Sequence, residues 1–184
     1  MNSGLISQRY AKALLNYAQA NKLDEQLYLE AKTVLNSFRH APQVHVVLAS
    51  PFVSQEEKKN ILLLLAGAEP SKALERLVAL LIENERAESF EHIILAYIAL
   101  YRKQNRIHTL RLTTASDLDD ATKERLLTRI GQILGGKLEV ESFVDPEILG
   151  GFVFEADSLR WDASLSRQLA NIRKEYTLNN SKSL

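Results

Sequence analysis

The first hundred residues carry apolar side chains at helical spacing. Apolar positions recur every three or four residues, which is the period of an amphipathic α-helix. The pattern predicts longer helices over residues 5–18, 27–38, 54–65, 71–84 and 90–101. A valine-rich segment between Pro42 and Pro51 would suit a strand by β-propensity, but its place in a helical half favours a short helix. We therefore expect about six helices, packed as an antiparallel bundle over residues 1–105.

The apolar period then changes from 3.6 to 2, which marks a domain boundary between residues 1–105 and residues 106–184. Residues 107–114 alternate between apolar and polar side chains as a strand does. A helix capped near Asp119 follows, and Gly135-Gly136 ends it before a second strand. The sequence thus predicts a mostly α-helical protein of two domains, in which a small α/β domain follows the bundle and ends in a frayed tail from Asn179 onwards.

A stretch rich in turn residues separates the second strand from the last helix. Asp145-Pro146 ends an extended apolar run, because proline fixes φ and disfavours helix for the residue before it. Gly150-Gly151 then precedes a strand with one buried face, in which Phe152, Phe154 and Ala156 alternate with Val153 and Glu155. Asp162 is a good N-cap for a final helix with apolar residues at Leu165, Leu169 and Ile172.

Three interpretations of this stretch are open. Asp145, Asp157 and Asp162 are potential metal ligands, although their spacing fits no calcium loop and no histidine or cysteine assists them. Gly150-Gly151 resembles a phosphate cradle only in composition, because these glycines precede a strand and not a helix. We favour the third interpretation, a structural turn at Asp145, Pro146, Gly150, Gly151 and Asp162 whose carboxylates cap backbone or face water.

Composition argues against several classes of protein and of chemical site. The 184 residues include 23 basic and 23 acidic side chains, so the formal net charge is zero, whereas a nucleic-acid binder usually has a basic excess. Cysteine is absent, which removes disulfides, thiol nucleophiles and thiolate metal sites. No apolar run approaches the ~20 residues that span a bilayer. The four histidines lack metal-ligand spacing, and neither a P-loop nor a nucleophile elbow is present, so we expect no catalytic residues, cofactor or metal.

Two of the predicted helices have unusually wide apolar faces. At 100° per residue, the apolar positions of helices 5–18 and 71–84 cover an arc of about 200°, whereas a surface helix needs roughly 100°. Burial of both helices at the centre of the bundle would explain the excess. A groove that receives a partner's amphipathic helix would explain it equally well.

The order of several motifs resembles that of the ATP synthase delta subunit family, whose mitochondrial counterpart is the oligomycin-sensitivity-conferring protein. The C-terminal stretch contains, in order, Asp145-Pro146, Gly150-Gly151, Asp157, Asp162, Ser164 and Leu169. The N-terminus contains Ile6-Ser7-Gln8-Arg9-Tyr10-Ala11-Lys12-Ala13-Leu14. Arg86 after a helical run and Thr114-Ala115 after a strand also match. The resemblance extends over nearly the whole chain.

The resemblance implies a non-catalytic connector in the peripheral stalk of a proton-translocating ATP synthase. In that family the N-terminal bundle holds the N-terminal helix of an alpha subunit between its first and fifth helices, and the C-terminal domain joins the b subunits. Carried over, the site for the alpha-subunit helix comprises Tyr10, Ala13, Leu14, Tyr17, Ala73, Leu77 and Leu80. The connector would keep the catalytic head from turning with the rotor. A first helix starting near Met1 would leave no room for an import peptide, which suggests the cytoplasmic side of a bacterial membrane, without insertion into it.

Two other classes of protein are consistent with parts of the sequence. A helical bundle can bind RNA or act as another kind of adaptor, and RNA binding would require a basic face that a salt titration would reveal. A small enzyme built on the glycine turn would require a cofactor or an activated side chain, and a ligand would then raise its melting temperature.

Overall fold

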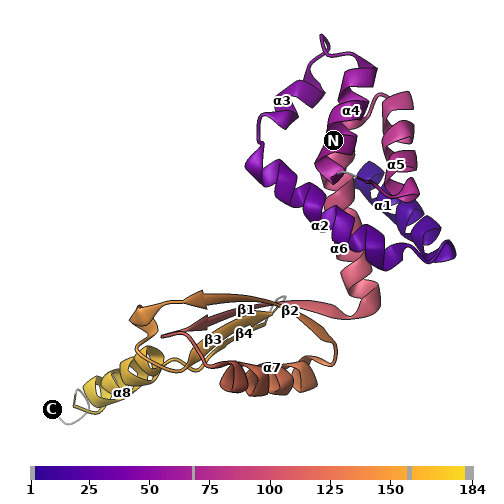
Figure 1. The fold of residues 1–184 in the computed structure, drawn as a ribbon. Coiled ribbons are helices and arrows are strands. Elements are labelled where there is room, and N and C mark those ends of the chain that lie inside the picture. Colours follow the sequence, from indigo (N-terminus) through magenta and orange to yellow (C-terminus); the bar gives the residue numbers. More distant parts are fainter. Residues whose placement is uncertain (1–2, 68, 157–158, 181–184) are drawn as a thin grey trace. The chain divides into compact units, whose positions relative to one another are not determined.

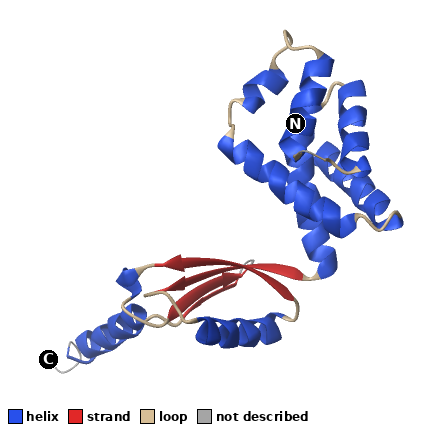
Figure 2. Cartoon of the chain, in the orientation of Figure 1, coloured by secondary structure: helices blue, strands red, loops and turns tan. Residues whose placement is uncertain are grey.

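The chain forms two compact units, residues 1–104 and residues 105–184 (Figure 1). The computed structural model describes residues 3–67, 69–156 and 159–180. The division lies one residue from the boundary that the change of apolar period predicts. Helices make up the first unit, and the second combines a small sheet with helices (Figure 2).

The N-terminal unit follows the predicted order of helices. Its elements are α1 (Ser3–Ala20), α2 (Asp24–His40), α3 (Val44–Ala49), α4 (Gln55–Ala66), α5 (Lys72–Glu83), the 3₁₀ turn η1 (Ala87–Ser89) and α6 (Phe90–Asn105). The valine-rich segment is helical, as expected. Ser54 caps α4 by accepting the Glu57 N–H, while the Glu57 carboxylate accepts the Ser54 N–H, which is a complete capping box. Ser71 caps α5 by accepting the Leu74 N–H.

The core of this unit is built around α6. Phe90, Ile93 and Ile94 on this helix are fully buried. Tyr97 is buried too, and its hydroxyl donates to the Asp24 carbonyl oxygen of α2 at 3.0 Å. Burial raises the pKa of Tyr97, so the phenol stays protonated and keeps this hydrogen bond. The central helix is therefore joined to its neighbours by apolar packing and by polar contacts, which include a second bond to α2 from Arg102 Nε to the Tyr28 hydroxyl at 2.9 Å.

The C-terminal unit contains one four-stranded sheet with mixed strand directions. Its elements are β1 (Ile107–Thr114), α7 (Asp120–Leu134), β2 (Lys137–Val144), the 3₁₀ turn η2 (Pro146–Ile148), β3 (Phe152–Ala156), β4 (Leu159–Asp162) and α8 (Leu165–Asn180). The strand order is β2-β1-β3-β4. β1 and β2 are parallel, with α7 as the connection between them, whereas β3 pairs antiparallel with β1 and with β4.

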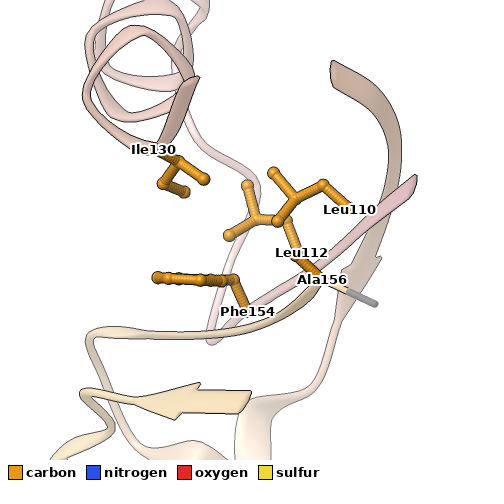
Figure 3. Close-up of a cluster of buried hydrophobic side chains, with 5 residues drawn as sticks. All are labelled: Leu110, Leu112, Ile130, Phe154 and Ala156. Atoms are coloured by element: carbon orange, nitrogen blue, oxygen red, sulfur yellow. The ribbon is translucent and has the colours of Figure 1, made fainter. Parts of the chain in front are cut away.

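One face of the sheet packs against α7. Leu110 and Leu112 of β1 and Phe154 and Ala156 of β3 are buried against Ile130 of α7 (Figure 3). The alternation of period 2 in the sequence predicts this face. The predicted cap of α7 is also confirmed, since the Asp119 carboxylate accepts the Thr122 N–H at 3.0 Å.

The other face of the sheet carries opposite charges in register. Glu141 on β2 lies beside Arg111 on β1, which lies beside Glu155 on β3. Glu155 in turn pairs with Arg160 on β4, with a nitrogen–oxygen distance of 2.8 Å. Opposite charges on neighbouring strands attract, while an apolar partner would have to desolvate them. This charged row is thus suited to water, whereas Val153, on the same face, is buried.

Two details differ from the sequence prediction. The strand β4 has no counterpart in the predicted elements, because its four residues, Leu159–Asp162, are too few to show a period. The expected frayed tail begins too early, since α8 extends to Asn180 and so includes Asn179. Residues 181–184 of that tail lie outside the described part of the chain.

Candidate partner-binding surfaces

Two tyrosine–arginine pairs join α1 to the end regions of α5. Arg76 Nη1 donates to the Tyr17 hydroxyl at 2.6 Å, and its guanidinium lies 5.2 Å from the centre of that ring. Arg86 Nη1 donates to the Tyr10 hydroxyl at 3.2 Å, with its guanidinium 5.8 Å from the ring centre. Tyr17, near the end of α1, thus meets the start of α5, while Tyr10 meets a residue just beyond its end. The two helices therefore run antiparallel.

The turn at Asp145, Pro146, Gly150 and Gly151 is held by backbone hydrogen bonds. The Asp145 carboxylate accepts the Glu147 N–H at 3.0 Å, and the Asp145 N–H donates to the Thr114 carbonyl at 2.8 Å. The Gly150 carbonyl accepts the Leu165 N–H at 2.9 Å. These bonds tie the end of β1 and the start of α8 to the turn.

Gly151 is placed unfavourably for binding a phosphate. Its φ is +74°, and a Cβ built on it would lie only 2.2 Å from the Ala163 carbonyl oxygen. The open side of this glycine therefore faces an electronegative atom, which repels an anion. Asp157, one of the three potential metal ligands, lies outside the described residues. In the part of the chain that is described, no three acidic or histidine side chains gather as metal ligands would.

The predicted N-cap at Asp162 is wrong. Asp162 is the last residue of β4, and Ser164 caps α8 instead, with its hydroxyl accepting the Arg167 N–H at 3.3 Å. The Asp162 carboxylate supports this cap by accepting the Ser164 N–H at 3.1 Å and its hydroxyl at 2.6 Å. These hydrogen bonds from Ser164, together with Arg167, lower the pKa of Asp162, so its carboxylate stays charged. Serine and aspartate are both common caps, and the sequence does not show which of them the helix uses.

The last helix presents a partly exposed apolar stripe. Leu165, Leu169 and Ile172 recur at helical spacing along α8, and their exposed fractions are 43%, 49% and 56%. The helix extends away from the strands and contacts η2 beside the turn (Figure 1). Leu149, at the end of η2, adds a further exposed apolar side chain. Such a stripe matches one face of a helix pair.

Comparison with known proteins decides the family. The family model of the ATP synthase delta (OSCP) subunit matches residues 6–176. The chain belongs to this family. A relative named ATP synthase subunit delta from Bacteroides fragilis is 38% identical over 96% of both chains. Relatives of the same name from Bacteroides thetaiotaomicron and Synechocystis are 35% and 33% identical over 96% and 92% of both chains.

A solved structure shows the same fold. One chain of the Toxoplasma gondii mitochondrial ATP synthase hexamer superimposes with a TM-score of 0.66 at 20% identity, over 93% of this chain and 97% of that one. The family model and the curated relatives confirm as family membership the resemblance inferred from motif order. No helix in the described ranges has the length and apolar character needed to cross a bilayer.

The seven residues that the delta family implies for binding the alpha-subunit helix differ in exposure. Leu14, Ala73 and Leu77 are buried in the core, with exposed fractions of 6%, 1% and 5%. Ala13 and Leu80 are exposed, and Tyr10 and Tyr17 are half-buried between the core and the surface. Part of each wide apolar arc therefore serves the core, and only its edge reaches water. Arg76 and Arg86, which flank this edge, were not predicted as part of the site, because their tyrosine partners lie 59 and 76 residues away in sequence.

Proposed function

We propose that this chain is a non-catalytic connector in the peripheral stalk of a proton-translocating ATP synthase. The observation that carries the proposal is the family match, which extends over both units from residue 6 to residue 176. The connector binds alpha subunits of the catalytic head through its N-terminal unit and b subunits of the stalk through its C-terminal unit. It acts mechanically, by resisting the torque of the rotor, at the cytoplasmic side of a bacterial membrane.

The N-terminal unit receives the alpha-subunit helix at the edge between α1 and α5. Ala13 and Leu80 are exposed there, and the two tyrosines lie on either side of Ala13 along α1. A small alanine allows close approach of a second helix, while Leu80 and the tyrosine rings supply apolar contact area. Leu14, Ala73 and Leu77 support this surface from the core and do not contact the partner directly.

The C-terminal unit receives a helix of the b subunits along α8. The stripe of Leu165, Leu169 and Ile172 spans two turns and is exposed along its whole length. An amphipathic helix that covers this stripe would remove its apolar side chains from water, at about 25 cal/mol per Å² of buried apolar surface. The charged face of the sheet is less suited to this role, because its charges would lose their hydration.

Titration calorimetry on the full chain tests both halves of the proposal. The ligands are two peptides of the same organism, one from the N-terminus of the alpha subunit and one from the C-terminus of the b subunit. Leu80→Asp should weaken binding of the alpha peptide at least tenfold and leave binding of the b peptide unchanged. Leu169→Asp should weaken binding of the b peptide at least tenfold and leave binding of the alpha peptide unchanged. Leu64→Asp and Ile133→Asp, at exposed apolar positions on α4 and α7, are the matched controls and should change neither affinity. Failure of either peptide to bind the native chain would contradict its half of the assignment.

A further inference from the structure

The two arginines that flank the α1–α5 edge carry charge that no carboxylate in the described ranges neutralises. Within those ranges, the hydrogen bonds and ring contacts of Arg76 and Arg86 go to tyrosines of α1, whereas Arg160 and Arg167 form ion pairs with Glu155 and Asp162. Arg76 and Arg86 are also exposed. A guanidinium has five N–H donors, and the hydroxyl of one tyrosine occupies only one side of it. Each arginine therefore keeps donors available for an anionic group.

The spacing of these arginines is fixed by α1. Tyr10 and Tyr17 are seven residues apart and thus lie on one face of the helix, about 10.5 Å apart along its axis. Each hydroxyl accepts a hydrogen bond from its arginine, and each guanidinium lies near a ring, so both arginine side chains are held in place. Exposed Ala13 lies between the two tyrosines on α1, and exposed Leu80 lies between the two arginines in sequence. Each end of this segment of α1 therefore has a held positive charge, and between the two tyrosine–arginine pairs each helix exposes an apolar side chain.

We infer that Arg76 and Arg86 select a partner helix that carries two carboxylates about two turns apart, with apolar residues between them. Carboxylates at positions i and i+7 of a helix match the spacing that α1 imposes, and the intervening apolar residues cover Ala13 and Leu80. Arginine suits this role because its planar fork binds carboxylates in a defined geometry. The inference rests on the proposed function, since it specifies the chemistry of the partner at the same surface.

Designed peptides test the inference on the full chain. Three amphipathic helical peptides share one apolar face. The first carries two glutamates at positions i and i+7, the second carries two glutamates at i and i+4, and the third carries two glutamines at i and i+7. We expect the first to bind on the order of tenfold more tightly than the third, because each exposed ion pair contributes up to about fivefold. The second should gain only one such pair and bind with intermediate affinity. The advantage of the first peptide should shrink as salt screens the charges.

Variants assign the preference to the two arginines. The double variant Arg76→Gln with Arg86→Gln should bind the first and third peptides equally, while Arg76→Lys with Arg86→Lys should retain part of the preference. Lys59→Glu, at an exposed position of α4, is the control for net charge and should leave the preference unchanged. Melting temperatures show whether each variant is folded, and the comparison of peptides on the native chain needs no variant.

The outcomes separate this inference from the proposed function. Equal binding of the first and third peptides to the native chain, or a preference that persists in the double variant Arg76→Gln with Arg86→Gln, overturns the inference. If the native peptide of the alpha subunit then still binds and still responds to Leu80→Asp, the proposed function stands. If neither that peptide nor any designed peptide binds, both the inference and the alpha-subunit half of the proposed function fail.

Discussion

The two adjacent glycines before β3 meet different surroundings. Gly151 has a φ of +74°, which L side chains rarely adopt, and a Cβ on it would collide with the Ala163 carbonyl oxygen. Gly150 does not have a positive φ, and a Cβ there would make an ordinary contact with the Leu165 Cβ at 3.6 Å. Of the two, only Gly151 therefore requires glycine, although both belong to the motif by which the sequence resembles the family.

Substituting each glycine by alanine should separate the two positions. Gly151→Ala should lower the free energy of unfolding of the C-terminal unit by about 2–4 kcal/mol, through backbone strain and displacement of the Ala163 carbonyl. Gly150→Ala should change it by less than about 1 kcal/mol. Trp161, the one tryptophan of the chain, stacks on Phe154 and reports this unit in urea titrations followed by fluorescence. Equal losses for the two variants would show that the close approach at Gly151 is not decisive.

At the scale of elements, a wide apolar arc combines a core face with a surface edge. On α5 the buried face includes Ala73, Leu77 and Leu81, while Leu80 reaches the surface with an exposed fraction of 45%. On α1 the buried face includes Leu14, and Ala13 is exposed. The edge that we propose for partner binding is thus the part of each arc that is left after the core is filled.

A carboxylate introduced at a buried position of one arc should cost far more folding stability than one introduced at an exposed position of the other. Ala73→Asp would bury an unpaired carboxylate and should destabilise the N-terminal unit by about 3–5 kcal/mol. Ala13→Asp should remain folded and lose less than about 1 kcal/mol, mainly through helix propensity. Urea denaturation followed by the helical circular dichroism signal measures both. A severe loss of stability in Ala13→Asp would mean that this position is not open.

At the scale of the whole molecule, each unit has a separate core. Phe90, Ile93 and Tyr97 belong to the core of the N-terminal unit, and Leu110, Ile130 and Phe154 to that of the C-terminal unit. The chain passes from one unit to the other between α6 and β1, where Arg106 has a φ of +51°. The proposed connector function fits this organisation, because separate cores allow each unit to be shaped for its own proposed partner.

A fragment of residues 1–105 should fold without the rest of the chain. Its helices bury their apolar faces against one another, so it should give a helical circular dichroism spectrum and one cooperative melting transition. The fragment should also bind the alpha peptide with the affinity of the full chain. A spectrum with substantial strand content, or melting without cooperativity, would place the boundary elsewhere or make the two units interdependent.

The sequence alone determined the type and order of nearly all the elements. The change of apolar period separates helices from strands, because side-chain periodicity follows directly from backbone geometry. Local hydrogen bonds fix the caps at Ser54, Ser71 and Asp119, so these too were predictable from neighbouring residues. The order of motifs along the chain identified the family, which the comparisons confirm.

The tertiary structure decided what depends on residues distant in sequence. Strand β4 forms because its backbone pairs with that of β3. Its four residues are too few to show the alternation from which a strand can be predicted. Only the structure shows that Ala73 is buried and Ala13 is exposed, because the apolar arc of a helix does not indicate which part of it neighbouring elements cover. The pairing of Arg76 with Tyr17 joins residues 59 positions apart, and only the packing of α5 against α1 brings them together.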